Sequence, residues 1–195
     1  MPAIRSVSQP ISKALIHALR ESSLEKIKIH AFNPDLRIRE IPKPIPLVLG
    51  YWMSLVLASN PATRIIFKFN FETQSVLGIG KELFEKIGME NPSMEFIEDF
   101  AKEYCNLVAG SLKVIFEKQS IILGVSLPMV TKGFDEIFLA NQIKKEFNYV
   151  DYWEITDGKY AFQMSLHVDW IDPQLKSTFD NLQESDLTVG DIDFL

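Results

Sequence analysis

Four residues whose side chains could contact a partner recur at helical spacing between positions 98 and 110. They are Asp99, Glu103, Asn106 and Gly110. The intervals of four, three and four residues place them on one narrow face of an α-helix. A carboxylate binds cations, a carboxamide both donates and accepts hydrogen bonds, and a glycine leaves room for close approach. The pattern therefore predicts a flat patch against which a partner could dock.

The pair Glu-x-x-Asn is a weak motif by itself. With 15 Glu and 8 Asn in 195 residues, random placement gives about 0.6 such pairs, and the chain contains one, Glu103 and Asn106. A solvated helix face carries the same residue types, so this alternative stays open.

Other catalytic and metal-binding patterns are missing from the sequence. The three histidines, His17, His30 and His167, lie far apart and match no metal-ligand spacing, so we expect no metal site. Cys105 falls toward the apolar side of its helix and is predicted to be a core thiol, whereas His167 falls on the polar side of its strand and is predicted to be exposed. There is no P-loop, no GxSxG and no CxxC. Any chemistry must be modest or completed by a partner.

The composition is typical of one globular domain that works in the cytoplasm. The chain is 47% apolar and 24% charged and has a net charge of −6, which disfavours nucleic acids and anionic membranes as partners. The N-terminus lacks a signal-peptide core, and the longest apolar run, residues 47–58, is shorter than the roughly 20 residues that span a bilayer. We expect no membrane contact.

One long helix is predicted to carry the four residues. It begins at Asn91-Pro92, where Asn suits the cap and Pro the first helical position, and it runs to about Phe116. Its other face is an apolar stripe, which predicts packing on a sheet. The members of this stripe are Ile97, Phe100, Ala101, Tyr104, Val108, Leu112 and Ile115.

Antiparallel strands and further helices are predicted around it. Helical spacing marks residues 11–22 and 73–87. Strand patterns mark residues 27–41 (two short strands), 47–58, 65–71, 121–127, 149–155 and 160–170. We predict an α+β fold, an antiparallel β-sheet with two long helices packed on one face.

The chain divides into a domain and an acidic tail. We predict a single domain at 1–172 and a C-terminal tail at 173–195, which carries five acidic and no basic residues from Asp180 onward. The tail is predicted to be loosely held or to pack on a partner. Pro-rich residues 42–46 are predicted to be an extended connector.

The long helix and the strand after it resemble the chemotaxis phosphatase family of CheC, CheX and FliY. The family signature is Asp or Ser, three residues, Glu, two residues, Asn, and then a Pro just over twenty residues on. This chain supplies Asp99, Glu103, Asn106 and Pro128, with an interval of 21 or so residues before the proline. The runs NLVAG and SLPMVTKG also look like CheX, and the resemblance covers about residues 90–170.

The single-site arrangement of CheX is the better match. CheC carries two such sites, but the first helix here has Ile16 and Leu19 where a second Glu and Asn would fall. The resemblance implies a CheC-like fold and a homodimer. The chain departs from the pattern in being longer than a typical CheX and in residues 134–148.

The resemblance also implies a function. The substrate would be the phospho-aspartate of a CheY-like receiver domain, which supplies its own Mg²⁺, so the protein needs no cofactor of its own. Asn106 would orient the hydrolytic water and Glu103 would pair with a receiver lysine. Asp99 and Gly110 would serve docking. The alternatives are a CheX-like module that binds a receiver or another signalling partner without hydrolysis, and a structural dimer unit.

Overall fold

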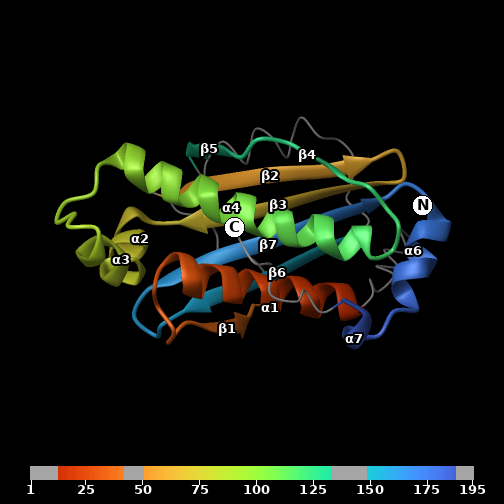
Figure 1. The fold of residues 1–195 in the computed structure, drawn as a ribbon, viewed down its shortest axis with the longest axis horizontal. Coiled ribbons are helices and arrows are strands. Elements are labelled where there is room, and N and C mark those ends of the chain that lie inside the picture. Colours follow the sequence, from red (N-terminus) through yellow and green to blue (C-terminus); the bar gives the residue numbers. More distant parts are fainter. Residues whose placement is uncertain (1–12, 42–50, 133–148, 188–195) are drawn as a thin grey trace, which may run out of the picture.

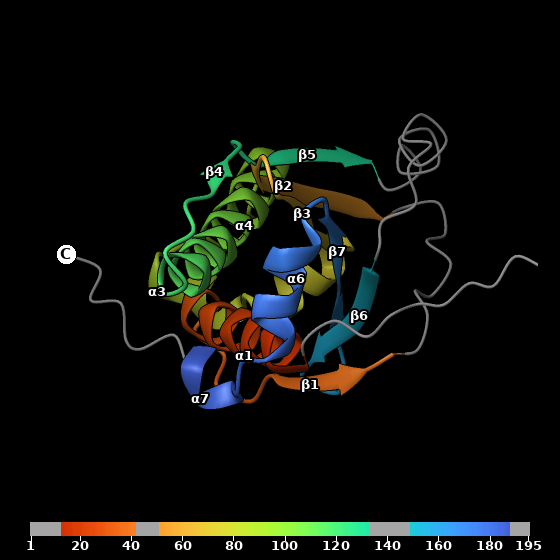
Figure 2. The same ribbon diagram turned by 90° about the vertical axis from the view of Figure 1, so that its right-hand side faces the viewer.

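A single antiparallel sheet with its helices gathered on one face makes up the protein. The computed structural model describes residues 13–41, 51–132 and 149–187. The end-on view shows α1 and α4 side by side on one side of the sheet (Figure 2). The predicted α+β class and the two long helices on one face are therefore confirmed. The connector predicted at 42–46 and residues 134–148, which depart from the family pattern, lie outside the described residues.

The helices and strands are labelled in Figure 1. They are α1 (Lys13–His30), β1 (Arg37–Glu40), β2 (Trp52–Asn60), β3 (Thr63–Phe71), α2 (Thr73–Ile79), α3 (Lys81–Lys86), α4 (Met94–Glu117), β4 (Gly124–Val125), β5 (Met129–Lys132), β6 (Tyr149–Thr156), β7 (Ala161–Trp170), α6 (Pro173–Asp180) and α7 (Glu184–Leu187).

The strands of the described chain pair in the order β1-β6-β7-β3-β2-β4, and β5 also pairs with β2. The pairs β2–β3 and β6–β7 are antiparallel hairpins. At the β6–β7 turn, Asp157 Oδ1 accepts hydrogen bonds of 2.8 Å from the backbone amides of Lys159 and Tyr160. Gly158 has a φ of +96°, a conformation that favours glycine. At the β2–β3 turn, Asn60 Oδ1 likewise accepts hydrogen bonds from two backbone amides.

Aromatic packing fixes α4 and α1 on the sheet. Phe67, Phe69 and Phe71 of β3 are fully buried, as predicted, and the Tyr104 ring of α4 meets Phe69 edge-on at 4.8 Å. The Tyr104 hydroxyl donates a 3.1 Å hydrogen bond to the Ser23 carbonyl of α1. Each large apolar side chain buried in this way stabilises the fold by about 1.5–3 kcal/mol.

The long helix starts slightly later than predicted. Its N-cap is Ser93, whose hydroxyl accepts a 3.2 Å hydrogen bond from the Phe96 amide, so the predicted cap at Asn91 is wrong. Pro92 accordingly precedes the helix. The predicted extent is otherwise correct, because the apolar stripe continues to Phe116 without interruption.

The first helix is longer than predicted. It continues to His30, so the short strand expected from residue 27 is wrong, whereas the strand after the turn is confirmed as β1. Leu19, Ser23 and Ile27 follow one another at intervals of four and are all buried, which shows a continuous helical face. Packing against α4 stabilises this face and overrides the local alternation.

An ion pair ties the first helix to the sheet. Arg20 donates two 2.8 Å hydrogen bonds to the carboxylate of Asp151 on β6. The guanidinium also lies over the ring of Trp153, 6.0 Å from its centroid. This bidentate contact fixes the rotation of α1 against the strands.

The strand predicted at 121–127 is mostly irregular. Of this segment only β4 is a strand, which pairs with β2, and β5 pairs with β2 farther along the chain. Between them the Ser126 amide donates to the Leu57 carbonyl at 2.8 Å, and the Ser126 hydroxyl accepts from the Leu57 amide at 3.0 Å. Pro128, which has no N–H to donate, then separates the two short strands.

Two other elements differ in extent from the prediction. The helix expected at 73–87 is divided into α2 and α3 at Gly80. The strand expected at 47–58 is β2, whose described part alternates between buried and half-buried positions such as Val56 and Leu57.

The start of the acidic tail packs firmly on the domain. Residues 173–187 form α6 and α7, which contact α1. Phe179 and Leu187 are fully buried, and Asp172 caps α6 by accepting a 2.8 Å hydrogen bond from the Gln174 amide. The expectation of a loosely held segment is wrong for this part. The last residues of the tail lie outside the described chain.

Candidate functional site

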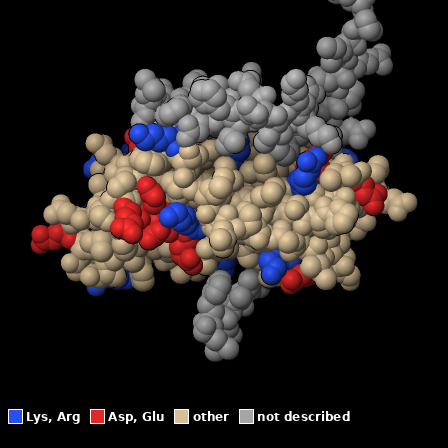
Figure 3. Space-filling model, turned by 90° about the horizontal axis from the view of Figure 1, so that it is seen from above, with Lys and Arg blue, Asp and Glu red and all other residues tan. Residues whose placement is uncertain are grey.

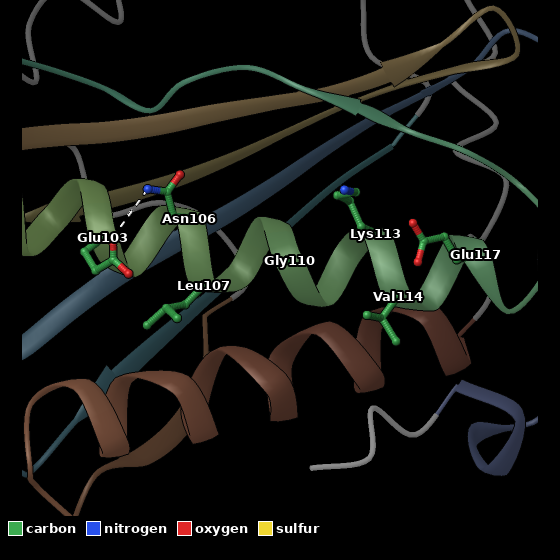
Figure 4. A pocket seen from close by; sticks show the side chains of 7 residues that line it. All are labelled: Glu103, Asn106, Leu107, Gly110, Lys113, Val114 and Glu117. Carbon is green, nitrogen blue, oxygen red and sulfur yellow. Dashed lines mark hydrogen bonds between the residues drawn. The ribbon is translucent and has the colours of Figure 1, made fainter. Parts of the chain in front are cut away.

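The exposed face of α4 carries the residues that the sequence singled out. Glu103 and Asn106 are exposed, whereas Tyr104 and Cys105 between them are completely buried. Figure 4 shows Glu103 and Asn106 projecting from successive turns of the helix. The buried neighbours hold the backbone of α4, so the two functional groups are displayed from a rigid base.

A hydrogen bond joins the two side chains. The Asn106 Nδ2 donates to Glu103 Oε2 at 3.5 Å, which is longer than the usual N–H···O distance of about 2.7–3.2 Å. The contact orients the carboxamide with its oxygen directed away from the carboxylate (Figure 4). In the described part of the chain, that oxygen accepts no hydrogen bond. It is available to an incoming water or partner group.

A shallow hollow of about 330 Å³ lies along this face. Gly110 forms its floor, and a Cβ atom built on Gly110 would have no atom within 4 Å among its neighbours. A partner could therefore approach the backbone of α4 closely at this point. The hollow is lined by Glu103, Asn106, Leu107, Gly110, Lys113, Val114 and Glu117.

Asp99 stands apart from this group. It lies one turn before Glu103 and does not line the hollow. Its carboxylate forms a 3.1 Å ion pair with Lys102 on the same helix. The structure thus brings together three of the four predicted residues, Glu103, Asn106 and Gly110, and places the fourth at the margin.

Two lining residues beyond Gly110 were not predicted from the sequence. Lys113 and Glu117 continue the same alternation of three and four residues beyond Gly110 and line the same hollow. The spacing itself was the signal that would have found them.

An apolar edge flanks the site. The β4–β5 segment runs along α4 on the side toward which Asn106 and Lys113 point (Figure 4). Viewed from that edge, the middle of the surface is largely uncharged, with acidic and basic residues gathered toward the sides (Figure 3). Exposed apolar side chains lie on this segment: Ile122, Val125, Leu127 and Met129.

Cys105 and His167 are not reactive groups. Cys105 is completely buried, as predicted, and burial raises the pKa of its thiol to about 12. His167 is only 9% exposed, so its predicted surface position is wrong. Burial, with a smaller contribution from Lys68, lowers the pKa of His167 to about 3 and keeps the ring neutral. The alternation along β7 correctly placed His167 on the polar side of the strand, but it could not reveal that this side of the strand is also buried.

Residues 13–41, 51–132 and 149–187 contain neither a metal-binding cluster nor a membrane-crossing helix. No group of three or more His, Cys, Asp or Glu side chains there could hold a metal ion. None of the helices in these ranges has the length and apolar character needed to cross a bilayer.

Comparison with known proteins identifies the fold. No protein-family model matches the sequence, and no curated protein does. Solved structures match over most of the chain. A chemotactic CheC-like protein from Shewanella oneidensis gives a TM-score of 0.60 at 20% identity, covering 80% of this chain and 98% of its own. The chemotaxis protein CheX from Vibrio vulnificus gives 0.61 at 16% identity, covering 79% and 98%.

The chain has the CheC-like fold. The CheX of Borrelia burgdorferi, solved as a CheX–CheY–BeF₃–Mg²⁺ complex, also matches, with a TM-score of 0.58 at 9% identity over 79% of this chain and 97% of that one. The CheC-like fold, which the resemblance implied, is thereby confirmed over about 80% of the chain.

Proposed function

We propose that this protein is a CheX-like phosphatase that hydrolyses the phospho-aspartate of a CheY-like receiver domain. The observation that carries the proposal is the exposed Glu103–Asn106 pair, one turn apart on the rigid face of α4. The fold supports it, because similar structures include CheX proteins and a CheX bound to CheY.

The chemistry asks little of this chain. Water attacks the phosphorus, a new P–O bond forms, and the bond between phosphorus and the aspartyl oxygen breaks to release phosphate and the free carboxylate. The receiver supplies Mg²⁺ and a lysine around the phosphoryl oxygens. What is missing is a group that holds the water in line with the leaving oxygen. Asn106 fills that role through its carboxamide oxygen, which accepts a hydrogen bond from the water.

Glu103 fixes the docked position. Its carboxylate pairs with the receiver lysine, and its contact with Asn106 Nδ2 holds the carboxamide in the rotamer that presents the oxygen. Gly110 gives the receiver room to approach the helix. Asp99 serves as an outer docking group. The homodimer, the cytoplasmic location and the lack of a cofactor of its own stay predictions.

The test is phosphate release from receiver domains charged with acyl phosphate in the presence of Mg²⁺. The wild-type protein is expected to accelerate release from at least one receiver of the same organism. Binding to a receiver without acceleration would favour the second candidate, a non-catalytic docking module, for which the exposed apolar edge along β4–β5 is the supporting observation.

Glu103→Gln is expected to reduce kcat/KM about tenfold. Loss of one charge-assisted hydrogen bond weakens an interface by about 1.5–3 kcal/mol. The effect should fall mainly on KM, because glutamine keeps an oxygen that can accept the Asn106 N–H but loses the charge that pairs with the receiver lysine. Steady-state kinetics with varied receiver measures it. Glu82→Gln on α3, outside the hollow, is the matched control and should behave as wild type.

Gly110→Ala and Gly110→Leu separate docking from stability. The alanine variant is expected to be more stable by about 0.5–1 kcal/mol, since glycine disfavours helix interiors and nothing lies within 4 Å of the new Cβ. The leucine variant should fold equally well but raise KM at least tenfold by filling the hollow. Thermal unfolding and phosphate release test the two effects. Unchanged kinetics for the leucine variant would place docking elsewhere.

A further inference from the structure

The exposed row of residues on α4 that lines the hollow, called the docking strip below, is longer than the proposed reaction requires. Positions 103, 106, 110, 113 and 117 follow intervals of three and four, so their side chains form one straight row on the helix. All of them line the same hollow. At 1.5 Å per residue, Lys113 lies about 15 Å along the axis from Glu103.

Lys113 is a cation that this chain leaves available. It is exposed and makes no ion pair with any described residue, although Glu117 follows it at i+4. Lys102, one face over on the same helix, is by contrast paired with Asp99 at 3.1 Å and Glu98 at 4.0 Å. The hollow therefore presents the Glu103 carboxylate at one end and, beyond the glycine, the unpaired Lys113 ammonium followed by the Glu117 carboxylate.

We propose that Lys113 selects and orients the receiver partner by pairing with an acidic side chain about 15 Å from the receiver cation that meets Glu103. This inference rests on the proposed function. Two opposite charges separated along one helix fix the direction of docking, because a receiver turned end over end would bring like charges together. Lys113 is thus a positioning residue that does not touch the reacting phosphoryl group. The receiver group that pairs with Lys113 is a surface carboxylate.

The test measures both binding and turnover in the full-length protein. Binding uses receiver domains held in the activated form with beryllofluoride and Mg²⁺, and turnover uses the same receivers charged with acyl phosphate. Lys113→Glu is expected to weaken binding and raise KM about tenfold, with kcat at saturating receiver unchanged, and Lys113→Arg is expected to stay near wild type. Lys81→Glu makes the same charge change on α3, outside the hollow, and is the matched control.

A charge exchange gives the decisive outcome. Replacing the facing receiver carboxylate by lysine should restore the binding of Lys113→Glu while weakening that of the wild type. If wild type accelerates phosphate release and Lys113→Glu matches it in KM, the role of Lys113 is overturned and the phosphatase stands. If wild type neither binds nor accelerates any receiver, both proposals are overturned.

Discussion

Asn106→Ala should lower kcat for receiver dephosphorylation at least about 100-fold and leave receiver affinity within threefold of wild type. Removing the carboxamide removes the group that holds the water in line, and misplacement of a reactant by about 1 Å costs on this order. The Asn106 side chain is exposed and bonds only to Glu103 in the described chain, so folding should not change. Stopped-flow measurement of receiver dephosphorylation gives kcat, and binding to the beryllofluoride-bound receiver gives affinity.

Asn106→Asp is the matched control for this experiment. It keeps the shape and the acceptor oxygens but loses the N–H that bonds to Glu103 and adds a second carboxylate one turn from it. A strong loss in the aspartate variant as well would show that orientation of the carboxamide matters, beyond its oxygen alone. Wild-type kcat in Asn106→Ala would contradict the assigned role of Asn106.

Phe179→Ala is expected to lower the free energy of unfolding by about 3–5 kcal/mol, the range for truncating a buried phenylalanine. Phe179 is completely buried. Its ring centroid lies 4.5 Å from that of Phe116 at the end of α4 and 5.3 Å from that of Trp170 at the end of β7. Removing the ring leaves a cavity at the point where the tail, the long helix and the sheet meet. Urea denaturation followed by tryptophan fluorescence measures the change.

Phe32→Ala provides the comparison for Phe179. Phe32 is 43% exposed and contacts Lys86 through its ring face at 3.8 Å. Its truncation should cost no more than about 1 kcal/mol, the value of an exposed cation–π contact. Equal small effects for both variants would mean that α6 is held as loosely as composition predicted.

Strong periodicity in the sequence predicted the elements in which apolar and polar residues alternate regularly. Helix α4 and strands β3 and β7 were each located to within a few residues in this way, although the polar face of β7 proved to be buried as well. The carboxylate, amide and glycine of the candidate site were located because they lie on the polar face of α4 at the spacing of a family pattern.

The remaining differences arise from contacts between distant segments. The second half of α1 alternates locally like a strand, yet its Ile27 is buried by α4. The acidic composition after Pro173 suggested a solvated tail, and one aromatic residue, Phe179, outweighs it by packing on two others. Lys113 was missed for a different reason: it continues the spacing of the site residues, but it lies outside the family pattern that singled out Asn106, and the hollow shows that the two line one surface.

The division of α4 into a completely buried face and an exposed strip affects how this protein can evolve. Tyr104, Cys105 and Val108 hold the helix, while Glu103 and Asn106 contribute little to holding it. Substitutions along the strip can therefore accumulate while the protein stays folded. They can change the partner or abolish hydrolysis, and selection against misfolding does not remove them. Backbone amides of the strip should exchange hydrogen with solvent only when the whole domain opens, even though their side chains face water. A descendant of this protein could lose its activity and keep its architecture and thermal stability intact.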